Sequence, residues 1–165
     1  MQEPKTAKPQ APPELDPIFR PQSIAVIGAS TEPHALGRQI LENIVNYRFR
    51  GHVYPVNPKA KELLGLRCFP SVRDIPDPVD LAVVVVPREH TLAVVADCGH
   101  KGVRGVVVIT AGFRETGEEG ATLELQLSAL ARRHGFRLIG PNCMGVINTD
   151  PLVRLNATFA PTMPF

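Results

Sequence analysis

Five short apolar runs, rich in β-branched residues, recur along this 165-residue chain and constrain its fold more than any other feature. Hydrophobicity within each run is continuous rather than alternating, which indicates strands buried on both faces, as in a parallel sheet. The runs are Ser23–Gly28, His52–Val56, Asp80–Val86, Arg104–Thr110 and Phe136–Ile139. Because Pro55 in the second run cannot donate a ladder hydrogen bond, that strand is expected at an outer position of the sheet.

Segments with helical periodicity separate several of these runs. Apolar residues recur in them three and four positions apart, which predicts helices with one buried face. The clearest opens at Glu118-Glu119 and closes at Arg132-Arg133-His134 before Gly135, so its charges match the helix dipole at both ends. The stretch 61–77 holds one glycine and two prolines, and we expect at most one short turn of helix there. The three predicted helices cover residues 36–47, 91–100 and 118–134.

Alternating strands and helices of this kind predict the α/β class. We expect a Rossmann-like, doubly wound parallel sheet of about five strands in a single domain. Prolines concentrate ahead of it, since six of the 17 lie in the first 21 residues. The sequence therefore predicts a disordered, proline-rich tail over 1–14, the Rossmann-like domain over 15–150, and a linker over 151–165 that leads towards a missing second domain.

The composition excludes several classes of protein. The net charge is only +2, there is no basic cluster, and tryptophan is absent, so we expect no nucleic-acid partner. No apolar run approaches the ~20 residues of a membrane-spanning helix, and the N-terminus lacks the apolar stretch of a signal peptide, so we expect no membrane partner. The three cysteines are widely spaced, which favours a reducing compartment and a cytoplasmic protein.

The loop after the first run has features of a phosphate-binding turn. Gly28 permits a tight turn, Ser30 offers a hydroxyl, and the following helix presents free N–H groups to an anion. Gly37 would let a phosphate approach the backbone, and Arg38 would add positive charge. The structural alternatives stay open, because any turn from strand to helix favours glycine and serine, and Arg38 could equally be a solvated helix residue.

The end of the second run separates the possible nucleotide ligands. Neither the Walker pattern nor the dinucleotide pattern of three closely spaced glycines is present. An NAD site needs an acidic residue at this point to bind the ribose hydroxyls, whereas this chain has Val56-Asn57-Pro58-Lys59. A lysine there suits a ribose that carries a phosphate, which describes NADP and coenzyme A but not NAD.

Three further loops should meet the first one at the carboxyl edge of the sheet, where ligands of such folds bind. Val86-Pro87 forms an apolar corner suited to an adenine ring or a pantetheine arm, although Pro87 also suits a simple helix start. Ile109-Thr110-Ala111 would face the first loop across the crevice. Gly140–Gly145 is a rigid turn in which Cys143 either approaches a bound thiol or is a small buried side chain, and we favour the second.

We assign no catalytic residue and no metal ligand. No grouping of histidine and cysteine has metal-ligand spacing, and no arrangement of serine, histidine and aspartate can be supported. His34 lies in the phosphate loop, where simple exposure is favoured over a role as a donor.

Four motifs, taken in order, resemble a known family. They are Asp16–Ser30, Val53–Lys59, Gly105–Phe113 and Gly140–Gly145. Together they resemble the coenzyme A-binding domain of NDP-forming acyl-CoA synthetases, which are relatives of the succinyl-CoA synthetase alpha subunit and include ADP-forming acetate–CoA ligases. The resemblance covers residues 15–159. One position departs from succinyl-CoA synthetases, which have Glu where this chain has Ala111, and the alanine removes a polar contact.

The resemblance implies that coenzyme A or an acyl-CoA is the ligand. The implied site residues are Gly28, Ala29, Ser30, Gly37, Arg38, Val56, Asn57, Lys59, Val86, Pro87, Ile109, Thr110, Ala111 and Asn142. ATP, ADP, Mg and the family's phosphorylated histidine would belong to the remaining ligase domains or subunit, so the chain alone is expected to be inactive. Its role would be to hold coenzyme A for acyl transfer in a reaction of acid, ATP and CoA to acyl-CoA, ADP and phosphate.

Two alternatives stay open at this point. The same unit occurs in fused protein lysine acetyltransferases, as a regulatory domain that binds CoA or acetyl-CoA. The lysine after the second run is also compatible with an NADP-binding oxidoreductase domain, which would leave the Gly140–Gly145 loop unexplained.

Overall fold

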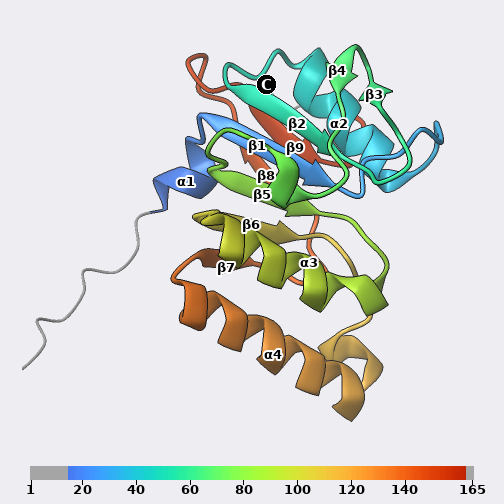
Figure 1. Cartoon of the computed structure of the whole chain (residues 1–165), viewed down its shortest axis with the longest axis vertical. Helices are drawn as coiled ribbons and strands as arrows, with labels where there is room; N and C mark the ends of the chain where they lie inside the picture. The colour runs from blue at the N-terminus through green and yellow to red at the C-terminus, as the bar shows by residue number, and fades with distance from the viewer. Residues whose placement is uncertain (1–14, 163–165) are drawn as a thin grey trace, which may run out of the picture.

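The computed structural model describes residues 15–162 and has a five-stranded parallel sheet at its centre (Figure 1). The strands are β1 (Ser23–Ile27), β2 (His52–Val56), β5 (Leu81–Val84), β6 (Gly105–Val108) and β7 (Arg137–Ile139). Their spatial order is β2-β1-β5-β6-β7, so the order reverses between β1 and β5. This confirms the predicted α/β class and the doubly wound parallel sheet, and each strand lies within one of the apolar runs.

The strand with the internal proline lies at the edge of the sheet. β2 pairs only with β1 within the sheet, with Ser23 opposite His52. On its outer side, the carbonyl of Pro55 accepts a hydrogen bond from the N–H of Phe69 at 3.0 Å. The predicted outer position is therefore confirmed.

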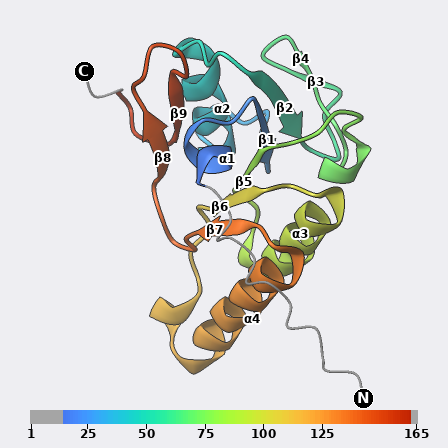
Figure 2. The same cartoon turned by 90° about the vertical axis from the view of Figure 1, so that its left-hand side faces the viewer.

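Two hydrophobic cores cover the two faces of the sheet. Helix α2 (Leu36–Asn46), the short α1 (Asp16–Phe19) and the hairpin of β8 (Gly145–Asn148) and β9 (Leu155–Thr158) pack on one face. Helices α3 (Arg88–Lys101) and α4 (Glu118–His134) pack on the other face, as Figure 2 shows. Along β1, Ile24 and Val26 point to the first core and Ala25 and Ile27 to the second, all at most 5% exposed.

The three long helices occur where periodicity predicts them. α4 has the predicted bounds, and Gly135 after it adopts the left-handed conformation that ends a helix. α3 begins three residues before the predicted start, because Pro87 precedes its first turn.

The stretch 61–77 contains more regular structure than its sequence predicts. A small hairpin of β3 (Glu62–Leu63) and β4 (Leu66–Arg67) precedes the 3-10 helix η1 (Val72–Asp74). The hairpin turns at Leu64 and Gly65, both with positive φ, and buries Leu63 in the first core. The short helix η1 agrees with the prediction of at most one turn of helix, whereas the hairpin was not predicted, because strands of two residues carry no periodicity.

The predicted linker also differs from the structure. Residues 155–158 form β9, which pairs antiparallel with β8 and is buried along its whole length. Leu155 and Ala157 belong to the same core as α2, and Asn43 of α2 donates to the carbonyl of Thr158 at 2.8 Å. The prediction of a linker from residue 151 is therefore wrong for residues 155–158. This strand was not recognised because polar residues interrupt its apolar ones. The predicted tail over 1–14 lies outside the described residues.

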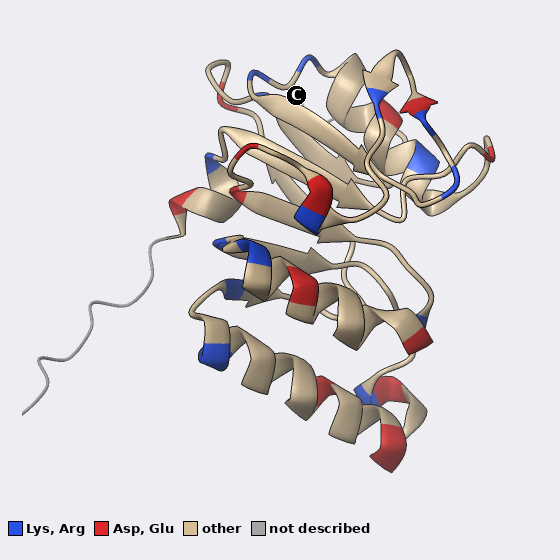
Figure 3. Ribbon diagram, in the orientation of Figure 1, with Lys and Arg blue, Asp and Glu red and all other residues tan. Residues whose placement is uncertain are grey.

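Charged residues are kept away from the centre of the sheet. Strands β1, β2, β5 and β6 carry none, and the charges lie on helices, on loops and on the peripheral strands β3, β4 and β7 (Figure 3). Over residues 15–162, none of the helices combines the length and the apolar character needed to cross a membrane.

Candidate functional site

Two cavities lie at the carboxyl ends of the strands, where the strand order reverses. The first, of about 550 Å³, is bounded by the loops after β1, β2 and β5, and the second, of about 670 Å³, by the loops after β1, β5 and β6. They share Gly28, Ser30 and the segment 85–87. An elongated ligand could therefore extend from one cavity into the other over this common wall.

The first loop turns sharply at Gly28. Its φ is +97°, and a Cβ there would lie 2.6 Å from the carbonyl oxygen of Val85, so only glycine fits. The Gly28 N–H donates to the carbonyl of Val56 at 3.1 Å, which holds the loop against the end of β2. The hydroxyl of Ser30 accepts the N–H of Glu32 at 3.1 Å, which orders the next turn of the loop.

Gly37 brings α2 into contact with this loop. A Cβ at Gly37 would lie 2.0 Å from the carbonyl oxygen of Gly28, so the helix can approach the end of β1 only without a side chain here. Helix–strand packing is thus a reason for this glycine that the sequence did not indicate. The start of α2 lines the second cavity, and its first turn has neither a side-chain cap nor an acidic residue. Its free N–H groups and the positive end of the helix dipole are left to attract an anion.

Arg38 points away from this arrangement. It lines neither cavity, and its Nε donates to the carboxylate of Glu42 at 2.6 Å, one helical turn along α2. The structure therefore does not bring Arg38 to the other predicted site residues.

Asn57 connects the first loop to the end of β2. Its Nδ2 donates to the carbonyl of Ala29 at 2.7 Å, and its Oδ1 accepts the N–H of Lys59 at 2.8 Å. The side-chain amide thus fixes both the phosphate loop and the turn that carries Lys59. The lysine side chain is exposed and borders the first cavity, where it is the only Lys or Arg among the lining residues within the described part of the chain.

The opposite wall of the first cavity comes from α3 and was not predicted. His90, Val94 and Asp97 line it from one face of the helix. Their spacing of four and three residues is the signal that could have revealed a shared face. Asp97 forms an ion pair with Arg73 at 3.7 Å, which offsets its charge beside the cavity. Ser71, in the loop before η1, also lines the cavity and had no recognisable signal.

The second cavity is bounded by loops that are tied together. The hydroxyl of Thr110 donates to the carbonyl of Val86 at 2.7 Å, and the N–H of Asn142 donates to the carbonyl of Thr110 at 3.0 Å. Among the described residues that line this cavity there is no Lys, Arg, Asp or Glu. Leu36, Met144 and Phe159 add apolar surface that the sequence did not indicate. The cavity suits an uncharged chain with a few polar groups.

Cys143 lines the second cavity and is half-buried. Its thiol donates to the carbonyl of Val108 at 3.3 Å, and burial raises the pKa of the thiol. At neutral pH the side chain is therefore a protonated thiol and a weak nucleophile. Within residues 15–162, no group of three or more His, Cys, Asp and Glu side chains could hold a metal ion.

All the predicted site residues except Arg38 line at least one of the two cavities. Those in the first cavity alone are Ala29, Val56, Asn57 and Lys59. Those in both are Gly28, Ser30, Val86 and Pro87. Those in the second alone are Gly37, Ile109, Thr110, Ala111 and Asn142. Their contacts with a ligand stay a prediction.

Comparison with protein families and curated proteins gives consistent matches. The model of the CoA binding domain family matches residues 22–149. Over 145 residues the chain is 50% identical to the alpha subunit of ADP-forming acetate–CoA ligase II of Pyrococcus furiosus, covering 88% of this chain and 31% of that subunit. It is 49% identical over 150 residues to ADP-forming acetate–CoA ligase I of Archaeoglobus fulgidus, covering 91% of this chain and 21% of that enzyme. The chain thus spans a third or less of the length of these relatives.

A solved structure shows the same fold. The dinucleotide-forming acetyl-coenzyme A synthetase 1 of Ca. Korarchaeum cryptofilum, in complex with phosphate and ADP, superposes with a TM-score of 0.84 at 49% identity. The match covers 90% of this chain and 31% of that one.

Proposed function

Because the chain belongs to the CoA-binding domain family of ADP-forming acetate–CoA ligases, we propose that it holds coenzyme A across the two cavities at the switch point. The observation that carries the proposal is the shared wall at 85–87, which joins a cavity bordered by one lysine to a cavity with uncharged lining. Coenzyme A has the same division, since a phosphorylated adenosine end continues into a pantetheine arm that carries no charge.

Each part of the ligand has a matching surface. The 3′-phosphorylated adenosine end would occupy the first cavity, with its phosphate near Lys59. The pyrophosphate would lie against the loop 28–37, where the start of α2 offers free N–H groups. The pantetheine arm would pass Pro87 and lie against Thr110 and Asn142 in the second cavity.

We further propose that the whole protein is an ADP-forming acyl-CoA ligase. The relatives carry that activity in their names, and their greater length leaves room for the parts that bind ATP and Mg and carry a phosphohistidine. Within such an enzyme, this chain would present the thiol of coenzyme A to an acyl phosphate formed elsewhere. That is catalysis by positioning, in which the reacting atoms are held at the right distance and orientation.

The three free cysteines fit a reducing, cytoplasmic setting.

Ligand-dependent thermal unfolding tests the proposal. The chain should be heated alone and with coenzyme A, NADP or NAD, because a ligand at 100 times its Kd adds about 2.7 kcal/mol to the stability of the fold. We expect coenzyme A to raise the Tm and NAD to leave it unchanged. A rise with NADP and none with coenzyme A would contradict the proposal and favour an oxidoreductase domain.

A further inference from the structure

Arg88 lies outside both cavities but contacts the loop that forms one of their walls. It is the first residue of α3 and directly follows Pro87, which borders both cavities. A positive charge in the first turn of a helix is disfavoured by the helix dipole. Local helix preference therefore does not explain an arginine at this position. We look for the explanation in its contacts with other elements.

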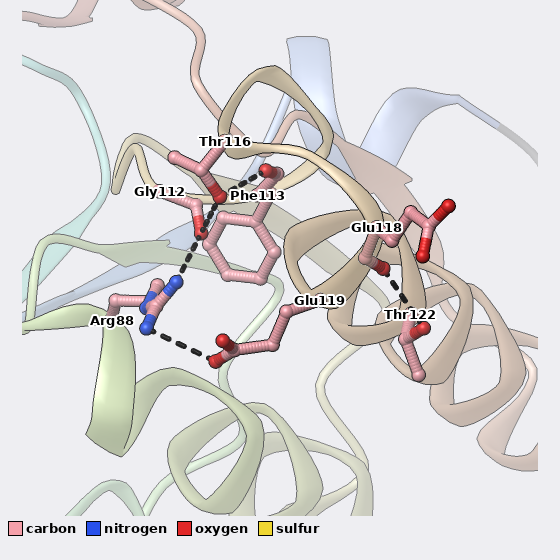
Figure 4. Close-up of polar contacts among 7 residues, drawn as sticks. All are labelled: Arg88, Gly112, Phe113, Thr116, Glu118, Glu119 and Thr122. Carbon is pink, nitrogen blue, oxygen red and sulfur yellow. Dashed lines mark hydrogen bonds and ion pairs between the residues drawn. The ribbon is translucent and has the colours of Figure 1, made fainter.

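The guanidinium of Arg88 connects α3 to the loop after β6 and to α4 (Figure 4). Its Nη1 donates to the carbonyl of Gly112 at 3.2 Å, and its Nη2 lies 3.3 Å from the carboxylate of Glu119. The aliphatic part of the side chain packs under the same loop, since a Cβ at Gly112 would lie 2.7 Å from Cδ of Arg88. Arg88 is thus in contact with Gly112 through both its stem and its charged end.

The backbone N–H and C=O of Gly112 also have partners besides Arg88. Its N–H donates to the carboxylate of Glu115 at 2.6 Å, and the hydroxyl of Thr116 approaches its carbonyl at 3.4 Å. The residue after Gly112 is Phe113, which is 1% exposed and packs in the second core. The loop is therefore fixed by its contacts with the 3-10 helix η2 (Arg114–Thr116) and with the second core, whereas Arg88 fixes it relative to α3.

The second cavity lies between these two elements. Pro87 borders it on the side of α3, and Ala111 borders it on the side of the loop, one residue before Gly112. Two hydrogen bonds join the segment 86–88 to the segment 110–112: the inner one runs from Thr110 to the carbonyl of Val86, and the outer one from Arg88 to the carbonyl of Gly112.

We propose that Arg88 is a positioning residue that sets the separation of the Pro87 and Ala111 walls, and thereby the fit of the pantetheine arm in the second cavity. The inference rests on the proposed function. It predicts that loss of the arginine weakens the hold on the pantetheine part of coenzyme A and leaves the nucleotide part nearly unaffected, because the first cavity has no wall from the loop 109–113.

The test compares two ligands on Arg88→Ala by calorimetric titration. Coenzyme A reaches both cavities, whereas adenosine 3′,5′-bisphosphate has the nucleotide end without the pantetheine arm. We expect the Kd for coenzyme A to rise about five- to tenfold, the low end for a charged hydrogen bond that is partly exposed. The Kd for adenosine 3′,5′-bisphosphate should change less than about twofold. Arg88→Lys, which keeps a donor and the charge, should recover most of the affinity for coenzyme A.

Arg114→Ala is the matched control. Arg114 also pairs with a glutamate of α4, Glu124 at 3.0 Å, but it lines neither cavity. This variant should bind both ligands as the unchanged chain does. An equal loss of both ligands in Arg88→Ala, an unchanged Kd for coenzyme A, or the same loss in Arg114→Ala would each overturn the inference. Failure of the unchanged chain to bind coenzyme A would instead overturn the proposed function.

Discussion

The lysine beside the first cavity offers a sharp test of how this site selects its ligand. Coenzyme A differs from dephospho-CoA by one phosphate, on the 3′ position of the ribose. If Lys59 contacts that phosphate, Lys59→Ala should weaken the binding of coenzyme A and leave the binding of dephospho-CoA nearly unchanged.

The structure sets the size of the effect. A charge-assisted hydrogen bond contributes about 1.5–3 kcal/mol when it is shielded from water. The side chain of Lys59 is exposed, and solvent and salt screen such a contact, so about 1 kcal/mol is the better expectation. At ~1.4 kcal/mol per tenfold change, this predicts a rise of about fivefold in the Kd for coenzyme A.

The assay is calorimetric titration of both ligands at low and high salt. Lys61→Ala provides the matched control, since Lys61 is also exposed and two residues away but lines neither cavity. High salt should shrink the difference between Lys59→Ala and the unchanged chain. Equal weakening of the binding of both ligands would refute the reasoning and indicate that Lys59 contacts the pyrophosphate or has a structural role. If the binding of neither ligand is weakened, Lys59 is a solvated loop residue and the reasoning is also refuted.

Three further perturbations test the loops around the cavities. Gly37→Ala should lower the free energy of unfolding by about 3 kcal/mol, because its Cβ would meet the carbonyl of Gly28 at 2.0 Å, and an unchanged urea midpoint would contradict this packing. Cys143 should react slowly with iodoacetamide at neutral pH, faster as pH rises, and more slowly still with coenzyme A bound; equal rates with and without ligand, measured by mass spectrometry, would argue against occupancy of the second cavity. Because the N–H of Gly112 lowers the pKa of Glu115 below its ordinary 4.5, the stabilisation from that carboxylate is present above pH 4.5 and is lost as pH falls through the lowered pKa. The Tm advantage of the unchanged chain over Glu115→Gln should therefore shrink in acid, and a constant difference would count against the contact.

The sheet could be predicted from the sequence because burial on both faces leaves a continuous apolar run. The edge strand could be identified because Pro55 has no N–H to donate, so it would break the hydrogen-bond ladder of a central strand. The bounds of α4 were predictable because its terminal charges and Gly135 report the helix dipole and the left-handed cap. The β3–β4 hairpin was missed because strands of two residues are too short for a pattern to appear, and β9 was missed because its polar Asn156 and Thr158 interrupt any continuous apolar run.

The candidate site was only partly predictable. Loops at the carboxyl ends of parallel strands must converge, so the loops that form the site could be predicted from the strands, whereas the set of individual residues was implied by the family resemblance. Whether a basic residue near a loop points into it depends on its rotamer and partners, which is why Arg38 was placed with the loop although it pairs with Glu42. Likewise, His90 and Asp97 reach the first cavity because α3 happens to turn that face towards it, a property of tertiary packing rather than of local pattern.

If coenzyme A spans the two cavities as proposed, their shared wall makes the site bivalent towards a ligand with two dissimilar ends. Once one end is bound, the other is confined near its own cavity at a high effective concentration, so the joined molecule binds far more tightly than either end alone. Neither cavity then needs high intrinsic affinity. A site of this kind can also release its occupant stepwise, because weakening the hold on one end returns the whole ligand to the modest affinity of the other. Tight capture and ready exchange can thus coexist on one rigid sheet edge.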